Sequence, residues 1–130
     1  MLGAVHFNAD DVRKSVYRNS GFFGEDAVEH ARRMGRYCDS ITVAGRFAIA
    51  DFICPTLKAR QAFGPAFVVW VDRIQERHYA DANQLFEPPE NYDVRVLPDG
   101  SPHVWVKHIC RRLKQYAPLA TLRQRPRELR

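Results

Sequence analysis

The chain of 130 residues, 45% hydrophobic and 27% charged, has the size and composition of one globular domain with a buried core. This composition excludes a disordered chain, a collagen-like fibre and a small disulfide-stapled scaffold. No apolar run approaches the roughly 20 residues that span a bilayer, and the N-terminus has no signal-peptide pattern, so we expect no membrane partner. The three cysteines form no CxxC pair, which favours reduced thiols and a cytoplasmic location.

The net charge of +5 comes from the C-terminal end of the sequence. Residues 107–130 contain eight Lys or Arg and one acid, which leaves twelve bases and fourteen acids in residues 1–106. We therefore expect one domain over residues 1–116 and a basic tail over residues 117–130. A basic tail can bind nucleic acid through the phosphates. Arg and Lys are also typical of helix ends and chain termini, and we favour this interpretation over a nucleic-acid partner.

Short apolar runs and segments of helical periodicity alternate along the chain. In chain order, the first half predicts a strand at 5–7, helices at about 10–18 and 25–45, a strand at 47–53 and a short helix at 56–63. The second half predicts a strand at 66–71, a polar loop with or without a short helix at 73–91, a strand at 92–97, and a closing helix at 102–116 after an Asp99-Gly100 turn.

Local signals mark the ends of several of these elements. Asp10 or Asp11 can cap the first helix, Gly45 is a natural stop for the second, and Pro55 suits the first turn of the third. The strands are apolar runs rather than alternating patterns, which is typical of a parallel sheet covered by helices. Ligands of such sheets lie beyond the carboxyl ends of the strands. The side chains expected at that edge are Asn8, Asp10, Ile53, Cys54 and Asp72.

The start of the first predicted helix combines an acid with a base. Asp10 and Arg13 are three residues apart, so they lie on one face of the helix. Together they can hold a magnesium-bound phosphate or accept a proton from a hydroxyl, although a capping acid and a helical salt bridge produce the same letters. Further along, His103 and His108 are five residues apart with Cys110 off their common face, which favours an ordinary amphipathic helix over a metal site.

Five short segments occur in a specific order along the sequence. They are NADDVR at 8–13, SGFF at 20–23, EDAVEH at 25–30, RR at 32–33 and FICP at 52–55 followed by Arg60. This order resembles the adenylyl-sulfate kinase family, whose pattern runs approximately DGDNVR, LGFS, EDRxEN, RR and FISP with a following basic helix. Residues 68–72 are similar to the family's FxxVFVD strand, and residues 87–91 to its YExPEN segment. The resemblance covers residues 5–115, most of the chain.

The resemblance implies a P-loop-kinase-like α/β fold and a known reaction. Members of the family use ATP and Mg²⁺ to phosphorylate the 3′-hydroxyl of adenosine 5′-phosphosulfate (APS). By resemblance, Asp10 is a catalytic residue near the magnesium ion and the reacting hydroxyl, Arg13 contacts the phosphosulfate and Phe22 stacks on the adenine. Ile53 and Cys54 would line the substrate pocket. Without the family context, Phe22 is equally explained as a core residue and Cys54 as an inert buried thiol.

The sequence departs from the family pattern at several positions. Asn8 replaces an acid, Ala27 an arginine, His30 an asparagine and Cys54 a serine. The 130 residues also contain no GxxxxGK[ST] segment, whose amides and lysine hold ATP phosphates in this fold. We therefore expect an N-terminally truncated chain that lacks the phosphate-loop strand. The strands at 47–53 and 66–71 would then pair directly or accept another chain, so the protein would be marginally stable or a homo-oligomer.

Three functions remain open at this point. The first is an adenylyl-sulfate-kinase-like protein of sulfate assimilation that is inactive without a phosphate loop. The second is a non-catalytic remnant that binds an adenine nucleotide or a partner protein. The third is a nucleic-acid-associated module that uses the basic tail.

Overall fold

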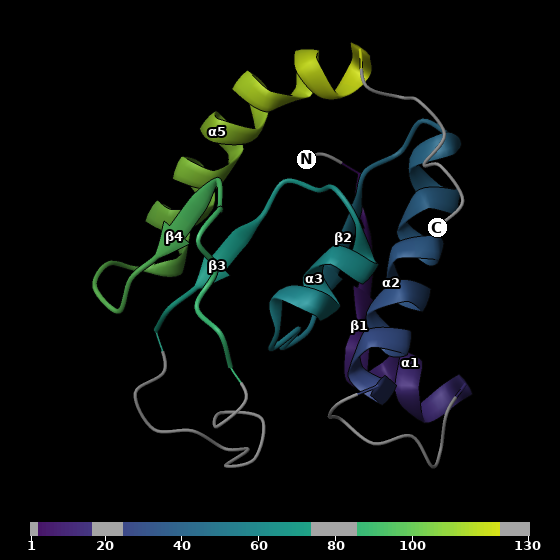
Figure 1. Cartoon of the computed structure of the whole chain (residues 1–130). Helices are drawn as coiled ribbons and strands as arrows, with labels where there is room; N and C mark the ends of the chain where they lie inside the picture. The colour runs from purple at the N-terminus through teal and green to yellow at the C-terminus, as the bar shows by residue number, and fades with distance from the viewer. Residues whose placement is uncertain (1–2, 17–24, 74–85, 123–130) are drawn as a thin grey trace. The chain divides into compact units, whose positions relative to one another are not determined.

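The computed structural model describes residues 3–16, 25–73 and 86–122 (Figure 1). The chain divides into two compact units. The first comprises Met1–Pro65 and Arg77–Pro88, and the second comprises Ala66–Glu76 and Pro89–Arg130. Each unit contains one two-stranded parallel sheet, β1 with β2 in the first and β3 with β4 in the second. The predicted α/β class with parallel strands and flanking helices is therefore confirmed.

The first unit follows the predicted order of elements closely. It contains β1 (Val5–Asn8), α1 (Ala9–Val16), α2 (Glu25–Val43), β2 (Ala48–Asp51) and α3 (Leu57–Phe63). In the β1–β2 ladder, Val5 lies opposite Ala48 and Asn8 lies opposite Asp51. The second strand ends at Asp51, two residues earlier than the apolar run does, and the backbone of Cys54 in the following loop has a left-handed φ of 44°. The expected Phe22 contact lies outside the described residues.

Asn8, rather than either aspartate, caps α1. Its side-chain Oδ1 accepts hydrogen bonds from the backbone N–H groups of Asp10 (3.1 Å) and Asp11 (3.2 Å). The sequence predicted Asp10 or Asp11 as the cap, and this was wrong, because the strand runs directly into the helix at Asn8. An asparagine at this position satisfies backbone N–H groups that the first helical turn leaves without a partner. The carboxylates of Asp10 and Asp11 are therefore not needed to cap α1.

Helix α2 supplies most of the core of the first unit. Its buried side chains recur at intervals of three and four residues and so share one helical face. Ala59 of α3 is fully buried against this face, and the rings of Phe52 and Phe63, 5.6 Å apart, pack on the same cluster. The residues of α2 that form the face are Val28, Ala31, Met34 and Cys38.

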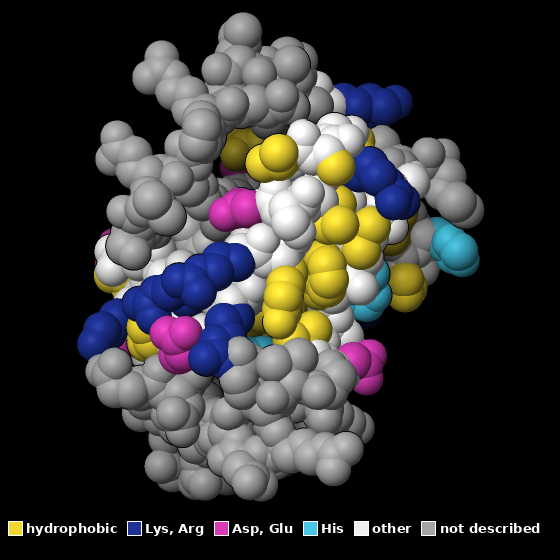
Figure 2. Space-filling view, turned by 90° about the vertical axis from the view of Figure 1, so that its right-hand side faces the viewer, with side chains coloured by type: hydrophobic (Ala, Val, Ile, Leu, Met, Phe, Trp, Pro, Cys, Tyr) yellow, Lys and Arg dark blue, Asp and Glu magenta, His cyan; other side chains and the backbone are white. Residues whose placement is uncertain are grey.

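The outer side of α2 is charged. Glu29 pairs with both Arg32 and Arg33, at helical spacings of three and four residues. Figure 2 views the molecule from the side on which α2 lies in Figure 1, and it shows basic and acidic side chains next to each other beside a band of hydrophobic side chains. Both arginines therefore have an ion-pair partner on their own helix, as expected of a solvated helix face.

The sheet of the first unit has one covered and one open face. Helix α2 packs on the covered face, where the ring of Phe7 stacks on that of Tyr37 with centroids 5.8 Å apart. Side chains alternate between the two faces along a strand. On the opposite face of the sheet, Ile49 is 52% exposed, and Phe47, which precedes β2, is 39% exposed. Phe47 and Ile49 thus expose large apolar side chains on this face of the sheet.

The second unit is built on β3 (Val69–Val71), β4 (Val94–Val96) and α5 (Pro102–Leu122). Val94 and Val96 are buried, α5 packs on β4, and the ring of Phe67 meets Tyr116 of α5 edge-on at 5.3 Å. Helix α5 continues to Leu122, beyond the predicted end at Tyr116. No described helix is long and apolar enough to cross a membrane.

The Asp99-Gly100 turn before α5 needs its glycine. Gly100 has φ 84°, a left-handed value that favours glycine, and a Cβ there would lie 3.1 Å from Nε1 of Trp105. That indole Nε1–H donates to the carbonyl oxygen of Asp99 at 2.7 Å. The turn and the first turn of α5 therefore hold each other in place, and the predicted turn is confirmed.

The strands β2 and β3 belong to different units, and each has a pairing partner within its own unit. Each sheet in the described part of the chain has two strands, so β2 pairs with β1 only and β3 with β4 only. The expected direct pairing of the two apolar strands, or their pairing with another chain, stays a prediction. Within its own unit each of these strands has one edge without a neighbouring strand, and backbone N–H and C=O groups on such an edge can pair with a further strand.

We expect the chain to self-associate through the open edge and face of the first sheet. Ile49→Lys places a charge on β2, and lysine on an edge strand disfavours pairing with another chain. The apparent mass from size-exclusion chromatography with light scattering should fall toward that of a monomer. Val43→Lys, at an 86% exposed position at the end of α2, is the matched control and should leave the mass unchanged. A wild-type chain that is monomeric at all concentrations would contradict this expectation.

Candidate functional site

The carboxyl ends of β1 and β2 are joined by polar side chains. Asn8 Nδ2 donates to Asp51 Oδ2 at 3.1 Å, and His6 Nε2 lies 3.4 Å from the same oxygen. Because Asn8 also caps α1, one amide ties the start of this helix to the end of β2. The first turn of α1 is thereby fixed at the carboxyl edge of the sheet.

Two of the predicted site residues lie on α1 at this edge. Asp10 is exposed in the first helical turn, where the helix dipole favours a negative charge. Arg13 follows three residues later on the same helix, and its side chain lies outside the described part of the chain. Asp10 therefore presents carboxylate oxygens, the ligand type that Mg²⁺ prefers, next to the end of β1.

The loop after β2 brings the other predicted residues to the same edge. Ile53 is 39% exposed, whereas Cys54 is half-buried and packs on the core cluster of the unit. Cys54 is the non-glycine residue with positive φ in the described backbone. A residue with a side chain adopts this conformation at a cost of about 1–2 kcal/mol. Such strain is concentrated at functional sites, where surrounding contacts hold it in place.

Arg60 and Glu87 hold this loop, and we refer to them as the Arg60–Glu87 clamp. The Arg60 guanidinium donates to the carbonyl oxygen of Cys54 at 3.0 Å and to that of Glu87 at 2.7 Å. The Glu87 carboxylate accepts from the backbone N–H of Leu57 at 2.9 Å, and the Glu87 N–H donates to the carbonyl of Pro55 at 2.7 Å. Sequence reasoning placed both residues in family-like segments but missed their contact.

The thiol of Cys54 has low reactivity in this environment. Burial raises its pKa to about 12, and the positive charge of Arg60 acts against this shift without reversing it. The thiolate is the reactive form of cysteine, so the thiol remains neutral and inert near pH 7. This agrees with a structural rather than a nucleophilic role for the residue.

Two departures from the family pattern are buried in the core. Ala27, at the position of an arginine in the family pattern, is 8% exposed. His30, at the position of an asparagine, is 7% exposed, and its ring meets Phe52 edge-on at 6.3 Å. Both positions therefore contribute to the packing of α2 here.

The predicted acid at the end of the β3 run is already paired within the second unit. Asp72 Oδ2 accepts from Arg95 Nη2 at 2.6 Å and from Nε at 3.0 Å. The hydrogen bond to Asp72 raises the pKa of the Arg95 guanidinium, which also lies 4.5 Å from the ring centre of Trp70. One oxygen of Asp72 is therefore held by two N–H groups of Arg95, and Asp72 is not presented as an isolated carboxylate.

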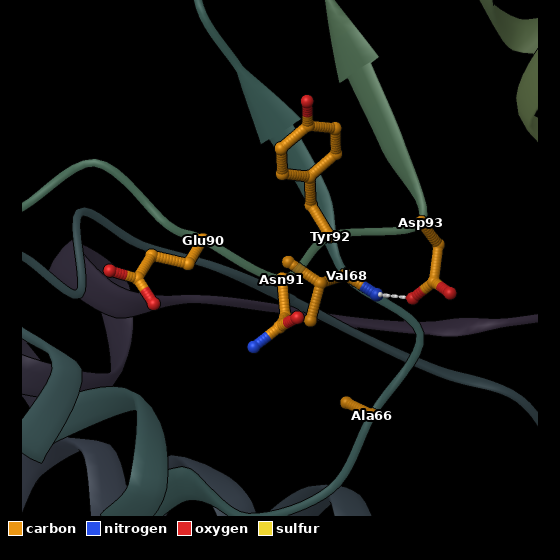
Figure 3. A pocket seen from close by; sticks show the side chains of 6 residues that line it. All are labelled: Ala66, Val68, Glu90, Asn91, Tyr92 and Asp93. Atoms are coloured by element: carbon orange, nitrogen blue, oxygen red, sulfur yellow. Dashed lines mark hydrogen bonds between the residues drawn. The ribbon is translucent and has the colours of Figure 1, made fainter.

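A separate pocket of about 580 Å³ lies in the second unit, at the amino ends of β3 and β4 (Figure 3). Figure 3 shows its side chains pointing in different directions, and Asp93 accepting a hydrogen bond from the N–H of Val68 at 2.7 Å. It contains none of the predicted site residues and lies at the end of these strands opposite to their carboxyl ends. Its lining residues are Ala66, Val68, Glu90, Asn91, Tyr92 and Asp93. The described residues contain no cluster of three or more His, Cys, Asp or Glu that could hold a metal ion.

Parallel strands and flanking helices define an α/β protein, and its likeness to solved structures shows a P-loop-kinase-like fold. The structure is similar to that of the Mycobacterium tuberculosis APS kinase CysC in complex with AMPPNP and APS. The two share 19% sequence identity with a TM-score of 0.70, over 87% of this chain and 81% of that one. A cysteine-to-alanine variant of the same kinase is 20% identical with a TM-score of 0.66, over 87% and 77% of the two chains.

The particular family follows from the sequence match. The adenylylsulphate kinase family model matches residues 3–72, which is more than half of the chain. The chain therefore belongs to the adenylylsulphate kinase family, as the motif order predicted. No curated protein sequence matches the chain.

We expect the Cys54 thiol to resist alkylation in the folded protein. Its pKa of about 12 leaves little thiolate between pH 7 and pH 9, and burial restricts access to the sulfur. Iodoacetamide labelling followed by peptide mass spectrometry should show slow modification of Cys54 in buffer and rapid modification in urea. Since the folded pKa lies above that of the unfolded chain, the free energy of unfolding should also fall as pH rises from 9 toward 12. Equal labelling rates in buffer and urea would contradict the buried position.

Proposed function

We propose that this chain is an adenylyl-sulfate-kinase-like protein that binds APS at the carboxyl edge of β1 and β2. The observation that carries the proposal is the convergence of two motif segments at that edge. The segment with Asp10 leaves β1 there, and the segment with Ile53 and Cys54 leaves β2 there. Both segments lie within the residues that match the family. Support also comes from the similar fold of a kinase whose structure contains APS.

Each site residue has a proposed task in this reaction. Asp10 accepts the proton of the 3′-hydroxyl and provides an oxygen ligand for Mg²⁺. Arg13 pairs with the phosphosulfate, Phe22 stacks on the adenine, and Ile53 and Cys54 form an apolar wall of the pocket. ATP supplies the γ-phosphoryl group, and Mg²⁺ neutralises charge on its phosphates. The exposed Asp10 carboxylate fits such an ion, because Mg²⁺ is commonly held by one or two carboxylates together with phosphates and water.

The 130 residues by themselves are proposed to bind APS without transferring phosphate. The sequence contains no GxxxxGK[ST] segment. Phosphoryl transfer depends on positioning and charge stabilisation of the nucleotide phosphates, so ATP binding by these residues alone should be weak. We place the kinase-like domain in residues 1–116 and propose a cytoplasmic location. We also propose that the chain self-associates through the first sheet.

A non-catalytic binding protein is the second candidate. The burial of Ala27 favours it, because the arginine of the family pattern, which by resemblance would bind the substrate, is absent and the position is part of the core. A protein of this kind would bind an adenine nucleotide or a partner protein and would catalyse no phosphoryl transfer. A third candidate, nucleic-acid binding by the basic tail, predicts affinity that collapses as salt is raised.

We expect isothermal titration calorimetry to detect APS binding and a radiometric assay to detect no ATP-dependent phosphorylation by this chain. Arg13→Ala removes a charged hydrogen-bond donor and should weaken APS binding about 10- to 100-fold. Lys14→Ala removes the same charge from the next position of α1, and consecutive helical positions do not share a face, so it should change the affinity less than about threefold. Equal effects of the two variants, or no binding by the wild-type chain, would contradict the proposed site.

A further inference from the structure

The loop of Ile53, Cys54 and Pro55 is held by hydrogen bonds to the carbonyl groups of Cys54 and Pro55. The Cys54 carbonyl accepts from Arg60 at 3.0 Å, and the Pro55 carbonyl accepts from the Glu87 N–H at 2.7 Å. Arg60 donates in turn to the carbonyl of Glu87 at 2.7 Å, so the three contacts form a closed arrangement. The contact between Arg60 and Glu87 joins segments 27 positions apart in the sequence.

We propose that Arg60 is a positioning residue of the candidate APS site, which holds the Cys54 backbone in its left-handed conformation by bridging the carbonyl groups of Cys54 and Glu87. This inference rests on the proposed function for the identity of the ligand. The conformation of Cys54 sets the direction in which the neighbouring side chain of Ile53 leaves the loop. Release of the clamp would therefore rearrange the pocket wall without removing any residue that touches the substrate.

The geometry requires an arginine rather than any base. The planar guanidinium presents several N–H groups in a fixed fork, so separate nitrogens, Nη1 and Nη2, reach the two carbonyls. The guanidinium carbon also lies 6.0 Å from the ring centre of Phe86. A lysine ammonium is a compact charge on a flexible stem, and it holds one carbonyl less rigidly than the fork holds two.

The backbone strain at Cys54 gives the proposal a specific signature. Glycine adopts a φ of 44° without the steric cost that Cys54 incurs. If Arg60 acts by holding this conformation, the loss of Arg60 should be less harmful where residue 54 is glycine. A purely structural role of Arg60 elsewhere in α3 would show no such dependence on residue 54.

The thiol of Cys54 reports on the loop independently of ligand binding. Loss of the Arg60 charge alone would raise the thiol pKa further and slow alkylation. Loss of the clamp would expose the thiol and accelerate alkylation. The two effects have opposite signs, so the direction of the rate change separates electrostatics from positioning.

The experiment measures iodoacetamide labelling of Cys54 and calorimetric APS affinity for the wild-type chain, Arg60→Ala, Arg60→Lys and the control Lys58→Ala. Lys58→Ala removes one positive charge from an exposed position of the same helix. Arg60→Ala should label at least tenfold faster and bind APS at least tenfold more weakly, with Arg60→Lys intermediate and Lys58→Ala close to wild type. Circular dichroism and thermal melting establish that each variant is folded. If Arg60→Ala does not fold, Arg60→Lys carries the comparison.

A second pair of variants tests the rescue. APS binding is compared between Cys54→Gly and Cys54→Gly/Arg60→Ala, and we expect the Arg60 substitution to cost less than threefold in this background. Equal losses in the cysteine and glycine backgrounds would overturn the proposal, as would unchanged or slower labelling of Arg60→Ala. Faster labelling with unchanged APS affinity would also overturn it, because the clamp would then not position the ligand site. If the wild-type chain binds no APS, the proposed function fails, and the labelling rates decide whether the clamp holds the loop.

Discussion

The parallel pairing of β1 with β2 is the constraint on which the candidate site depends. Parallel strands leave a sheet at the same edge, so α1 and the Ile53–Cys54–Pro55 loop begin side by side there. Asn8 and Asp51, 43 positions apart, mark this edge with a direct hydrogen bond. The same Asn8 side chain caps α1 and thereby sets where Asp10 stands. A shift of the ladder by one residue would move these side chains to the other face of the sheet.

The loop after β2 combines a strained backbone with hydrogen bonds that hold it. The left-handed backbone of Cys54 cannot continue a strand or a helix. Thr56 then caps α3 by accepting a hydrogen bond from the N–H of Ala59. Arg60 from α3 then returns to the Cys54 carbonyl. The helix that follows the loop therefore supplies the group that stabilises it. Such pre-organisation is common where a ligand must meet a defined wall, because the cost of ordering is met during folding.

Family membership does not imply an unchanged site in this chain. Ala27 and His30 stand at positions that carry polar residues in the family pattern, and both are buried on α2 here. A guanidinium placed at position 27 would have to leave water and would need a buried partner. The packing of α2 on the sheet is therefore compatible with the departures from the pattern. Among the described residues of the family pattern, Asp10 and the loop after β2 lie at the carboxyl edge of the sheet.

Much of the fold could be predicted from the sequence, because it depends on local signals. Apolar runs located the strands, and Asp99-Gly100 marked the turn before α5. Pro55 was expected in the first turn of α3, and this was wrong, because Thr56 is the N-cap and Pro55 precedes it. The order of short motifs also predicted the family that the sequence match shows. These features depend on residues close together in the chain, whose preferences act before any tertiary contact forms.

Other features were decided only by tertiary structure. Asn8 became the cap of α1 because the ladder with β2 extends to that residue. Asp72 is engaged by Arg95 because β3 and β4 lie side by side, with Trp70 opposite Arg95 in the register. The contact of Arg60 with Glu87 requires two distant segments to meet at the Cys54 loop. By itself, the sequence determined the elements and the motifs, whereas packing between distant residues determined which polar groups are paired and which face the site.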